Sequence, residues 1–139
     1  MQERLMGLDY GDSRTGVAVS DLLGITAQGV ESIKYTGEKQ LLNRLKEIIN
    51  EYQVKKIIIG LPLNMNATCG QRVEKTKRFI EKLKNEFGLE VITIDERLTT
   101  VASHRTMTEL GVRKEKKKNI VDMMSAILIL QMYLDRNRS

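Results

Sequence analysis

Residues 4–20 read Arg-Leu-Met-Gly-Leu-Asp-Tyr-Gly-Asp-Ser-Arg-Thr-Gly-Val-Ala-Val-Ser, and this stretch decides the fold. Two apolar runs, 4–9 and 14–20, flank the turn signal Tyr10-Gly11-Asp12-Ser13. Alternation of apolar and small residues in the second run is typical of a half-buried strand. We therefore expect a hairpin, which a third strand over about 28–35 extends into an antiparallel meander.

The apolar pattern changes its period after the meander. Helical spacing predicts helices over 41–52 and 73–87, and short, continuously apolar runs predict buried strands over 56–60 and 90–94. Two more helices are expected over roughly 99–110 and 120–134. This order predicts an α/β fold with a mixed five-stranded sheet, in which the antiparallel meander is joined by two parallel strands and helices cover both faces. A chain of 139 residues most simply forms one domain, 1–139.

Composition argues against several classes of protein. No apolar run approaches the ~20 residues of a membrane span, so we expect no membrane partner. The single Cys69 and single His104 do not support an internal disulfide, a zinc cluster or Ser-His-Asp catalysis. The first residues lack a signal-peptide pattern, and we expect a cytoplasmic protein in a reducing compartment.

One short stretch carries most of the net charge of +5. Residues 113–118 read Arg-Lys-Glu-Lys-Lys-Lys, which is five positive charges minus one negative, or +4. Such a run is either a solvated loop or a patch that contacts phosphates. Its position directly before the helix that carries Asp122 favours the second interpretation. The candidate nucleic-acid contacts are Arg14, Arg97, Lys116, Lys117 and Lys118.

Three carboxylates, far apart in sequence, each border an apolar segment. Asp9 and Glu96 follow predicted strands, and Asp122 lies near the start of the last predicted helix. A carboxylate beside a core is costly unless it is paired or holds a cation. Ligands gather at the carboxyl ends of parallel strands, so these groups can meet there. A shared site would suit Mg²⁺ or Mn²⁺, which prefer oxygen ligands.

Each of these residues also has a simpler interpretation. Asp9 is a common turn-initiating residue, and Asp122 is favoured by the dipole of a helix N-terminus. Neighbours on an extended chain point to opposite faces, so at most one of Asp95 and Glu96 faces the site; we favour Glu96 as the ligand and Asp95 as its support. Three polar residues complete the candidate set, although turn and capping roles also explain them: Asn64, Thr99 and Thr100.

Four motifs together resemble the YqgF (RuvX) family, in the same order and over almost the whole chain. They are Gly7-Leu8-Asp9-Tyr10-Gly11 with Gly16-Val17-Ala18-Val19-Ser20-Asp21, then Gly60-Leu61-Pro62-Leu63-Asn64-Met65, then Asp95-Glu96-Arg97-Leu98-Thr99-Thr100, and Val121-Asp122 before a helix ending Ile129-Leu130-Gln131. The second and third motifs in combination are highly specific.

The resemblance implies a ribonuclease H-like fold and nuclease activity. Its catalytic carboxylates correspond to Asp9, Glu96 and Asp122, which would hold two Mg²⁺ (or Mn²⁺) ions for phosphodiester hydrolysis. The family is described as processing the 5′ end of pre-16S ribosomal RNA and also as resolving Holliday junctions. The expected partner is therefore nucleic acid, either ribosomal precursor RNA or branched DNA, and a resolvase would act as a homodimer with two sites.

Two other classes of function compete with a nuclease. The Asp-x-Gly hairpin also opens a fold of sugar kinases and actin-like ATPases, but those enclose ATP between two such domains and this length supplies one. A non-catalytic RNA-binding protein of the same fold would bind without metal-dependent cleavage.

Overall fold

The computed structural model describes residues 3–62, 70–96 and 114–137, with side chains from residue 120 onward in the last of these segments. Its strands and helices are β1 (Arg4–Tyr10), β2 (Arg14–Ser20), β3 (Ala27–Lys34), α1 (Glu38–Tyr52), β4 (Val54–Leu61), α2 (Gln71–Phe87), β5 (Glu90–Asp95) and α4 (Lys114–Arg136). The strand order in the sheet is β3-β2-β1-β4-β5. The first three strands run antiparallel, and β4 and β5 join parallel to β1. The predicted fold class is confirmed.

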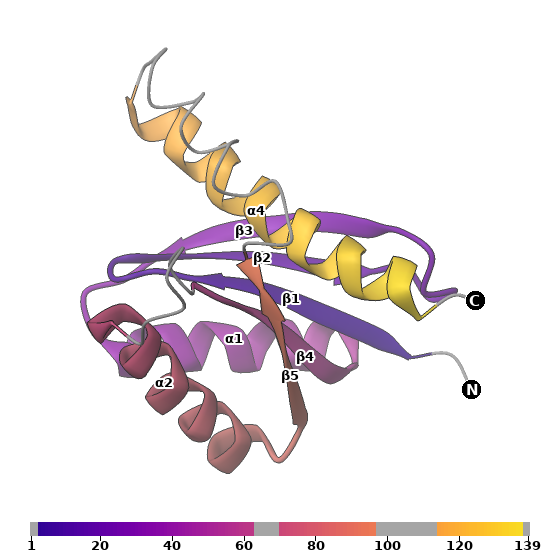
Figure 1. Cartoon of the computed structure of the whole chain (residues 1–139), viewed down its shortest axis with the longest axis horizontal. Coiled ribbons are helices and arrows are strands. Elements are labelled where there is room, and N and C mark those ends of the chain that lie inside the picture. The colour runs from indigo at the N-terminus through magenta and orange to yellow at the C-terminus, as the bar shows by residue number, and fades with distance from the viewer. Residues whose placement is uncertain (1–2, 63–69, 97–113, 138–139) are drawn as a thin grey trace.

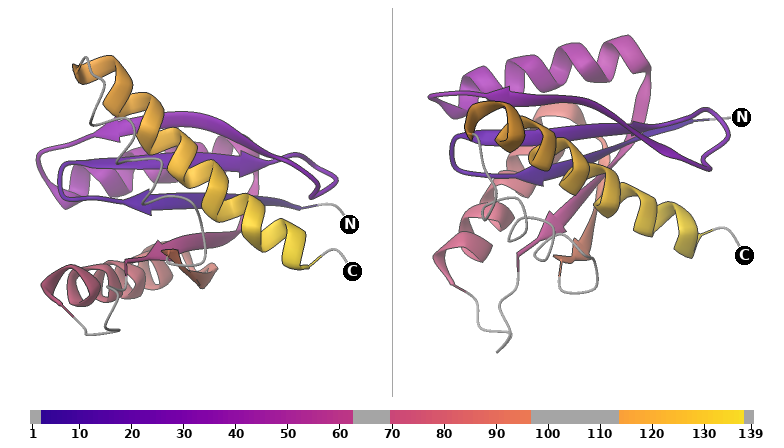
Figure 2. Two further views of the ribbon diagram at one scale, coloured as in Figure 1. Left: turned by 45° about the horizontal axis from the view of Figure 1, so that its top comes forward. Right: turned by 90° about the horizontal axis from the view of Figure 1, so that it is seen from above.

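Helices cover the two faces of this sheet unequally. Figures 1 and 2 show α4 crossing one face diagonally, while α1 and α2 lie on the other. Alternation along the strands separates two apolar clusters accordingly. On β1, Met6 and Leu8 join the cluster beneath α1 and α2. On β4, Ile58 joins the cluster beneath α4.

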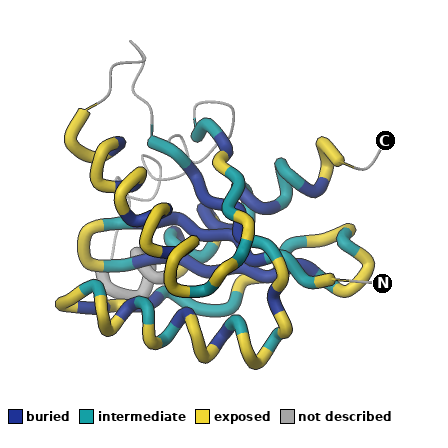
Figure 3. The backbone as a smooth tube through the Cα atoms, turned by 90° about the horizontal axis from the view of Figure 1, so that it is seen from below, coloured by how far each residue is buried: buried dark blue, intermediate teal, exposed yellow. Residues whose placement is uncertain are grey.

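The helices α1 and α2 form because each presents an apolar stripe to the sheet. In α1 the buried positions are Leu41, Leu45 and Ile48, which recur every three or four residues. Figure 3 shows buried and exposed segments alternating along the helices that face the viewer. The outer sides of both helices are strongly charged, so the sheet-facing stripe sets their orientation.

The helix α4 begins earlier than the sequence pattern predicts. We expected a helix from 120 onward with the basic run leading into it, but α4 starts at Lys114, so residues 114–118 form its first turns. Lys and Glu are good helix formers, but a prediction based on the spacing of apolar residues does not detect a helical turn made of charged residues. Asp122 is consequently the ninth residue of α4, more than two turns from its start.

The side-chain amide of Gln131 joins α4 to the β2–β3 hairpin. Its Oε1 accepts a hydrogen bond from the Ala27 N–H, and its Nε2 donates to the Ile25 carbonyl, both at 2.9 Å. This pair of bonds fixes the position of α4 along the sheet at the C-terminal half of the helix. None of the helices within the described part of the chain is long and apolar enough to cross a bilayer.

Candidate functional site

A row of residues across the sheet places Asp9 at the centre of the α4 face. In the strand register, Asp9 lies opposite Gly16 of β2, and Gly16 lies opposite Ser32 of β3. On the other side, Leu8 lies opposite Ile59, so Asp9 and Gly60 are the next residues along β1 and β4. Directly opposed residues point to the same face of a sheet. Asp9, only 4% exposed, is therefore flanked by two glycines on the face that α4 covers.

The glycine on β2 makes room for the backbone of α4 at Asp122. A Cβ atom placed on Gly16 would lie 1.9 Å from the Asp122 carbonyl oxygen and 3.2 Å from its Cα. Only a glycine permits this approach. This contact places the backbone of Asp122 over β2, the strand next to the one that carries Asp9, while the Asp122 carboxylate hydrogen-bonds to Ser32 on β3.

The glycine on β4 makes room for the side chain of Glu96. A Cβ atom on Gly60 would lie 2.9 Å from Glu96 Oε1 and 2.6 Å from Ile129 Cδ1, an atom of α4. Glu96 directly follows β5 and is partly buried on the α4 face. Neighbouring strands are about 4.8 Å apart, so this carboxylate lies one strand away from Asp9, on the side opposite Asp122.

Two serines complete the polar surroundings of the row. Ser32 Oγ donates a 2.9 Å hydrogen bond to Asp122 Oδ2. Ser125, one turn after Asp122 on α4, is fully buried, and its Oγ has no hydrogen-bond partner among the described residues. A buried hydroxyl in this state is available to a ligand. Our sequence analysis selected neither serine, because isolated serines carry no distinguishing pattern.

Carboxylates are the type of ligand that a hard divalent cation prefers, although the described residues are not grouped into a metal site. Within the described residues, no three His, Cys, Asp or Glu side chains are grouped closely enough to hold a metal ion. Three carboxylates on one face repel one another in the absence of a cation. The buried Ser125 hydroxyl, one turn after Asp122, adds a hard oxygen donor of the kind that such an ion prefers.

Other predicted site residues lie at the margin of this row. Arg14 opens β2 two residues before Gly16, which puts it on the α4 face towards the β1–β2 turn. Asp95 ends β5, and strand alternation directs it to the face opposite Glu96. The structure does not describe the predicted residues Asn64, Arg97, Thr99 and Thr100, nor the helix expected over 99–110. Lys116, Lys117 and Lys118 belong to α4, but the structure does not describe their side chains.

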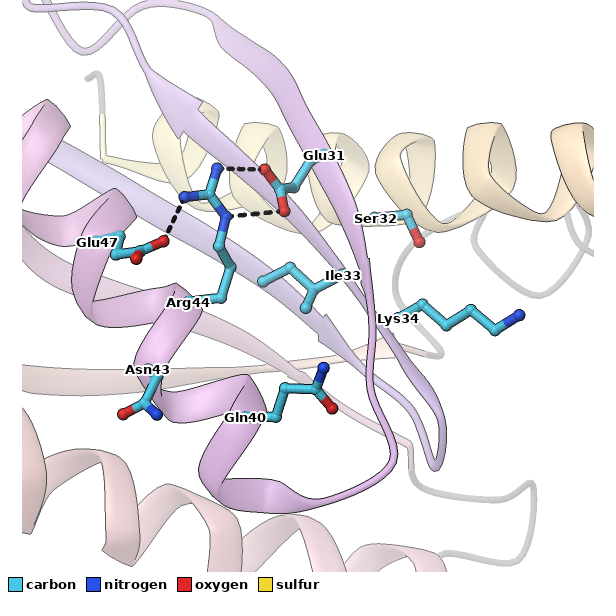
Figure 4. Close-up of a pocket in the computed structure, with 8 residues that line it drawn as sticks. All are labelled: Glu31, Ser32, Ile33, Lys34, Gln40, Asn43, Arg44 and Glu47. Carbon is cyan, nitrogen blue, oxygen red and sulfur yellow. Dashed lines mark hydrogen bonds and ion pairs between the residues drawn. The ribbon is translucent and has the colours of Figure 1, made fainter.

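A separate pocket at the β3 edge is built from paired charges. It measures about 360 Å³ and lies between β3 and α1. Arg44 lines it, donating from Nε and Nη2 to Glu31 at 3.0 and 2.7 Å and from Nη1 to Glu47 at 2.7 Å (Figure 4). These bonds, the Glu31 pair first, raise the pKa of Arg44 above its ordinary value. Since its cation is already paired, we place no substrate there.

Comparison with protein families and curated proteins gives a consistent match over nearly the whole chain. Residues 3–136 match the family described as "RuvX: Holliday junction resolvase". A protein of Ruminiclostridium cellulolyticum named "Putative pre-16S rRNA nuclease" is 58% identical over 134 residues, covering 96% of this chain and 94% of its own length. A protein of Clostridioides difficile with the same name is 53% identical, covering 95% and 94%.

Solved structures support the fold. RuvC of Thermus thermophilus superposes with a TM-score of 0.56 both in complex with a Holliday junction substrate and without it. The sequence identities are 13% and 10%, and each match covers 96% of this chain and 95% of the other. At this level of identity the match extends to the fold alone.

Proposed function

The chain belongs to the RuvX family, and from that premise we propose that it is a metal-dependent nuclease that processes the 5′ end of pre-16S ribosomal RNA in the cytoplasm. The observation that carries the proposal is the row across the sheet, in which glycines on the strands either side of β1 let Glu96 and the backbone of Asp122 pack onto the face that carries the buried Asp9. The names of the relatives supply the substrate class.

The three carboxylates would bind the metal for hydrolysis of a phosphodiester bond. Asp9, at the centre of the row, would hold two Mg²⁺ or Mn²⁺ ions together with Glu96 and Asp122. When bound, such ions supply activation of a water molecule and stabilisation of the leaving oxygen. Ser32 holds the Asp122 carboxylate in place through its hydrogen bond. Burial of Asp9 limits competing water around the reacting groups.

Positive side chains would hold the nucleic-acid backbone around this centre. Arg14 lies on the same face as the row, and the first turns of α4 carry Lys116, Lys117 and Lys118. Contacts of this kind position a substrate without reading its sequence. Arg97, with Asn64, Thr99 and Thr100, remains a candidate from the sequence for the same role.

Resolution of four-way DNA junctions is the alternative, favoured by the family description and the RuvC-like fold. A resolvase cuts two strands, so it needs two sites and would act as a symmetric dimer. Under that alternative the same three carboxylates would perform the cleavage.

The test is cleavage of a pre-16S RNA fragment and a four-way DNA junction in Mg²⁺. We expect the wild type to cut the RNA, and Asp9→Asn and Asp122→Asn to lose about 100-fold or more, since even outer partners of metal ligands cost 10–100-fold. Glu90→Gln, a matched acid-to-amide change at the first residue of β5, serves as the control. Cleavage by Asp9→Asn at the wild-type rate would refute the mechanism, and binding of RNA without cleavage by the wild type would indicate a non-catalytic protein.

A further inference from the structure

One flank of α2 carries a line of exposed cations. Arg72, Lys75 and Arg78 recur at three-residue spacing and are all exposed. At 3.6 residues per turn they lie within about a third of the helix circumference. Lys77 and Lys84 occupy the opposite flank of the same helix. We call the first three residues the α2 flank.

The α2 flank lies at the same end of the molecule as the candidate site. α2 follows the carboxyl end of β4, the strand that runs parallel to β1 and Asp9. Lys75 Nζ donates a 2.9 Å hydrogen bond to Asp12 Oδ1 in the β1–β2 turn, which begins immediately after β1. Figures 1 and 2 show the start of α2, this turn and the start of α4 at one end of the sheet.

The charges of the α2 flank attract an anion and are only partly neutralised. Asp12 is exposed and accepts the bond from Lys75, and this bond, the Lys75 charge and, more weakly, Arg72 lower the pKa of its carboxyl. Arg72 and Arg78 form no ion pair with any residue that the structure describes. The Asp12 carboxylate shows that an oxyanion can lie against Lys75.

Distance links this surface to the site. Asp12 lies three positions after Asp9 in the sequence, which allows at most about 11 Å of chain between them. Phosphates along one nucleic-acid strand advance about 3.4 Å each, so that span corresponds to roughly three nucleotides. A strand whose phosphate lies at Asp9 therefore reaches the β1–β2 turn and α2 within a few nucleotides.

Resting on the proposed function, we propose that the α2 flank, Arg72, Lys75 and Arg78, is a second contact surface for the sugar–phosphate backbone of the nucleic acid cleaved at Asp9. The bound strand passes from the α4 face over the β1–β2 turn to the start of α2. The Asp12 carboxylate occupies a phosphate position when nucleic acid is absent, and a phosphate displaces it from Lys75.

The experiment measures binding of a labelled RNA hairpin with single-stranded extensions, in EDTA so that no cleavage occurs, over a series of NaCl concentrations. Each lost phosphate contact reduces the slope of log K against log salt by about 0.7–0.9. We expect the Arg72→Ala/Arg78→Ala double variant to lose about 1.4–1.8 from the slope. The matched Lys77→Ala/Lys84→Ala variant of the opposite flank should retain it, as should the charge-keeping Arg72→Lys/Arg78→Lys variant. Asp12→Asn should bind more tightly than the wild type.

The outcomes separate this surface from the nuclease proposal. If both alanine pairs lose the same amount of slope, or if neither loses any, the proposed α2 contact surface is wrong. The proposed function still stands in that case, provided that the wild type binds and cleaves. A selective loss in the Arg72→Ala/Arg78→Ala variant, with a wild type that binds but does not cleave, supports the surface and overturns the nuclease.

Discussion

The Ser32 hydroxyl fixes one of the three carboxylates, and its removal tests how much the site depends on that contact. Hydrogen bonds to charged groups contribute about 1.5–3 kcal/mol. In Ser32→Ala the Asp122 carboxylate loses the donor 2.9 Å from its Oδ2 and with it the contact that fixes its orientation. We expect Mn²⁺ affinity to fall about 10–100-fold, measured by calorimetric titration of the folded protein, and the Mg²⁺ concentration for half-maximal cleavage to rise in parallel.

Ser32→Thr is the matched control, because it keeps the hydroxyl at the same position on β3. It should restore most of the metal affinity. Wild-type Mn²⁺ affinity in Ser32→Ala would show that the hydroxyl only stabilises the fold, and that another contact orients Asp122.

At the residue scale, the candidate site residues could be predicted from the sequence, but the close contacts around them could not. Asp9, Glu96 and Asp122 were selected because carboxylates beside apolar runs are conspicuous, and the structure places all three on the α4 face. The need for glycine at positions 16 and 60 could not be predicted, since it arises from atoms of α4 and Glu96 that approach only in the folded chain. Whether the three bind metal stays a prediction.

Packing of α2 against β1 joins two aromatic rings beneath the site. Tyr10 stacks on Phe79 with ring centroids 4.1 Å apart and an interplanar angle of 6°. Burial, chiefly, raises the pKa of Tyr10 from 10.0 to about 12. Between pH 10 and 12 the Tyr10 phenol therefore keeps its proton in the folded state and loses it in the unfolded chain. The free energy of unfolding falls as the pH rises through this range. A shift of this size corresponds to about 2–3 kcal/mol.

Chemical denaturation at successive pH values between 8 and 12 measures this loss, and tyrosinate absorbance reports the ionisation itself. Tyr10→Phe keeps the stacked ring and removes the titrating group, so its stability should decline less over the same interval. A residual decline is expected, because burial, chiefly, also raises the pKa of Tyr35. An identical decline in both proteins would mean that Tyr10 does not contribute.

At the element scale, the type of sheet could be predicted from the sequence, while the start of α4 could not. A meander followed by strand–helix alternation permits few topologies, and the predicted mixed sheet of an antiparallel meander and two parallel strands is confirmed. The residues from Lys114 to Lys118 are all charged, so the spacing of apolar residues gives no sign of a helix there. The structure shows that α4 extends through them. That extension removes the helix-dipole explanation for Asp122, which no longer lies in the first turn.

Across the whole molecule, the three carboxylates belong to β1, to the chain after β5 and to α4, segments that are joined only when the chain folds. A metal that binds them therefore binds the native state alone and stabilises it by RT ln(1 + [L]/Kd), about 2.7 kcal/mol at 100 times Kd. We expect thermal unfolding in Mn²⁺ to shift upward in the wild type and in Glu90→Gln, and to stay constant in Asp9→Asn. Asp9→Asn should be at least as stable as the wild type without metal, because it relieves repulsion among like charges. A wild type that Mn²⁺ does not stabilise would exclude metal binding by these three groups, whatever its activity.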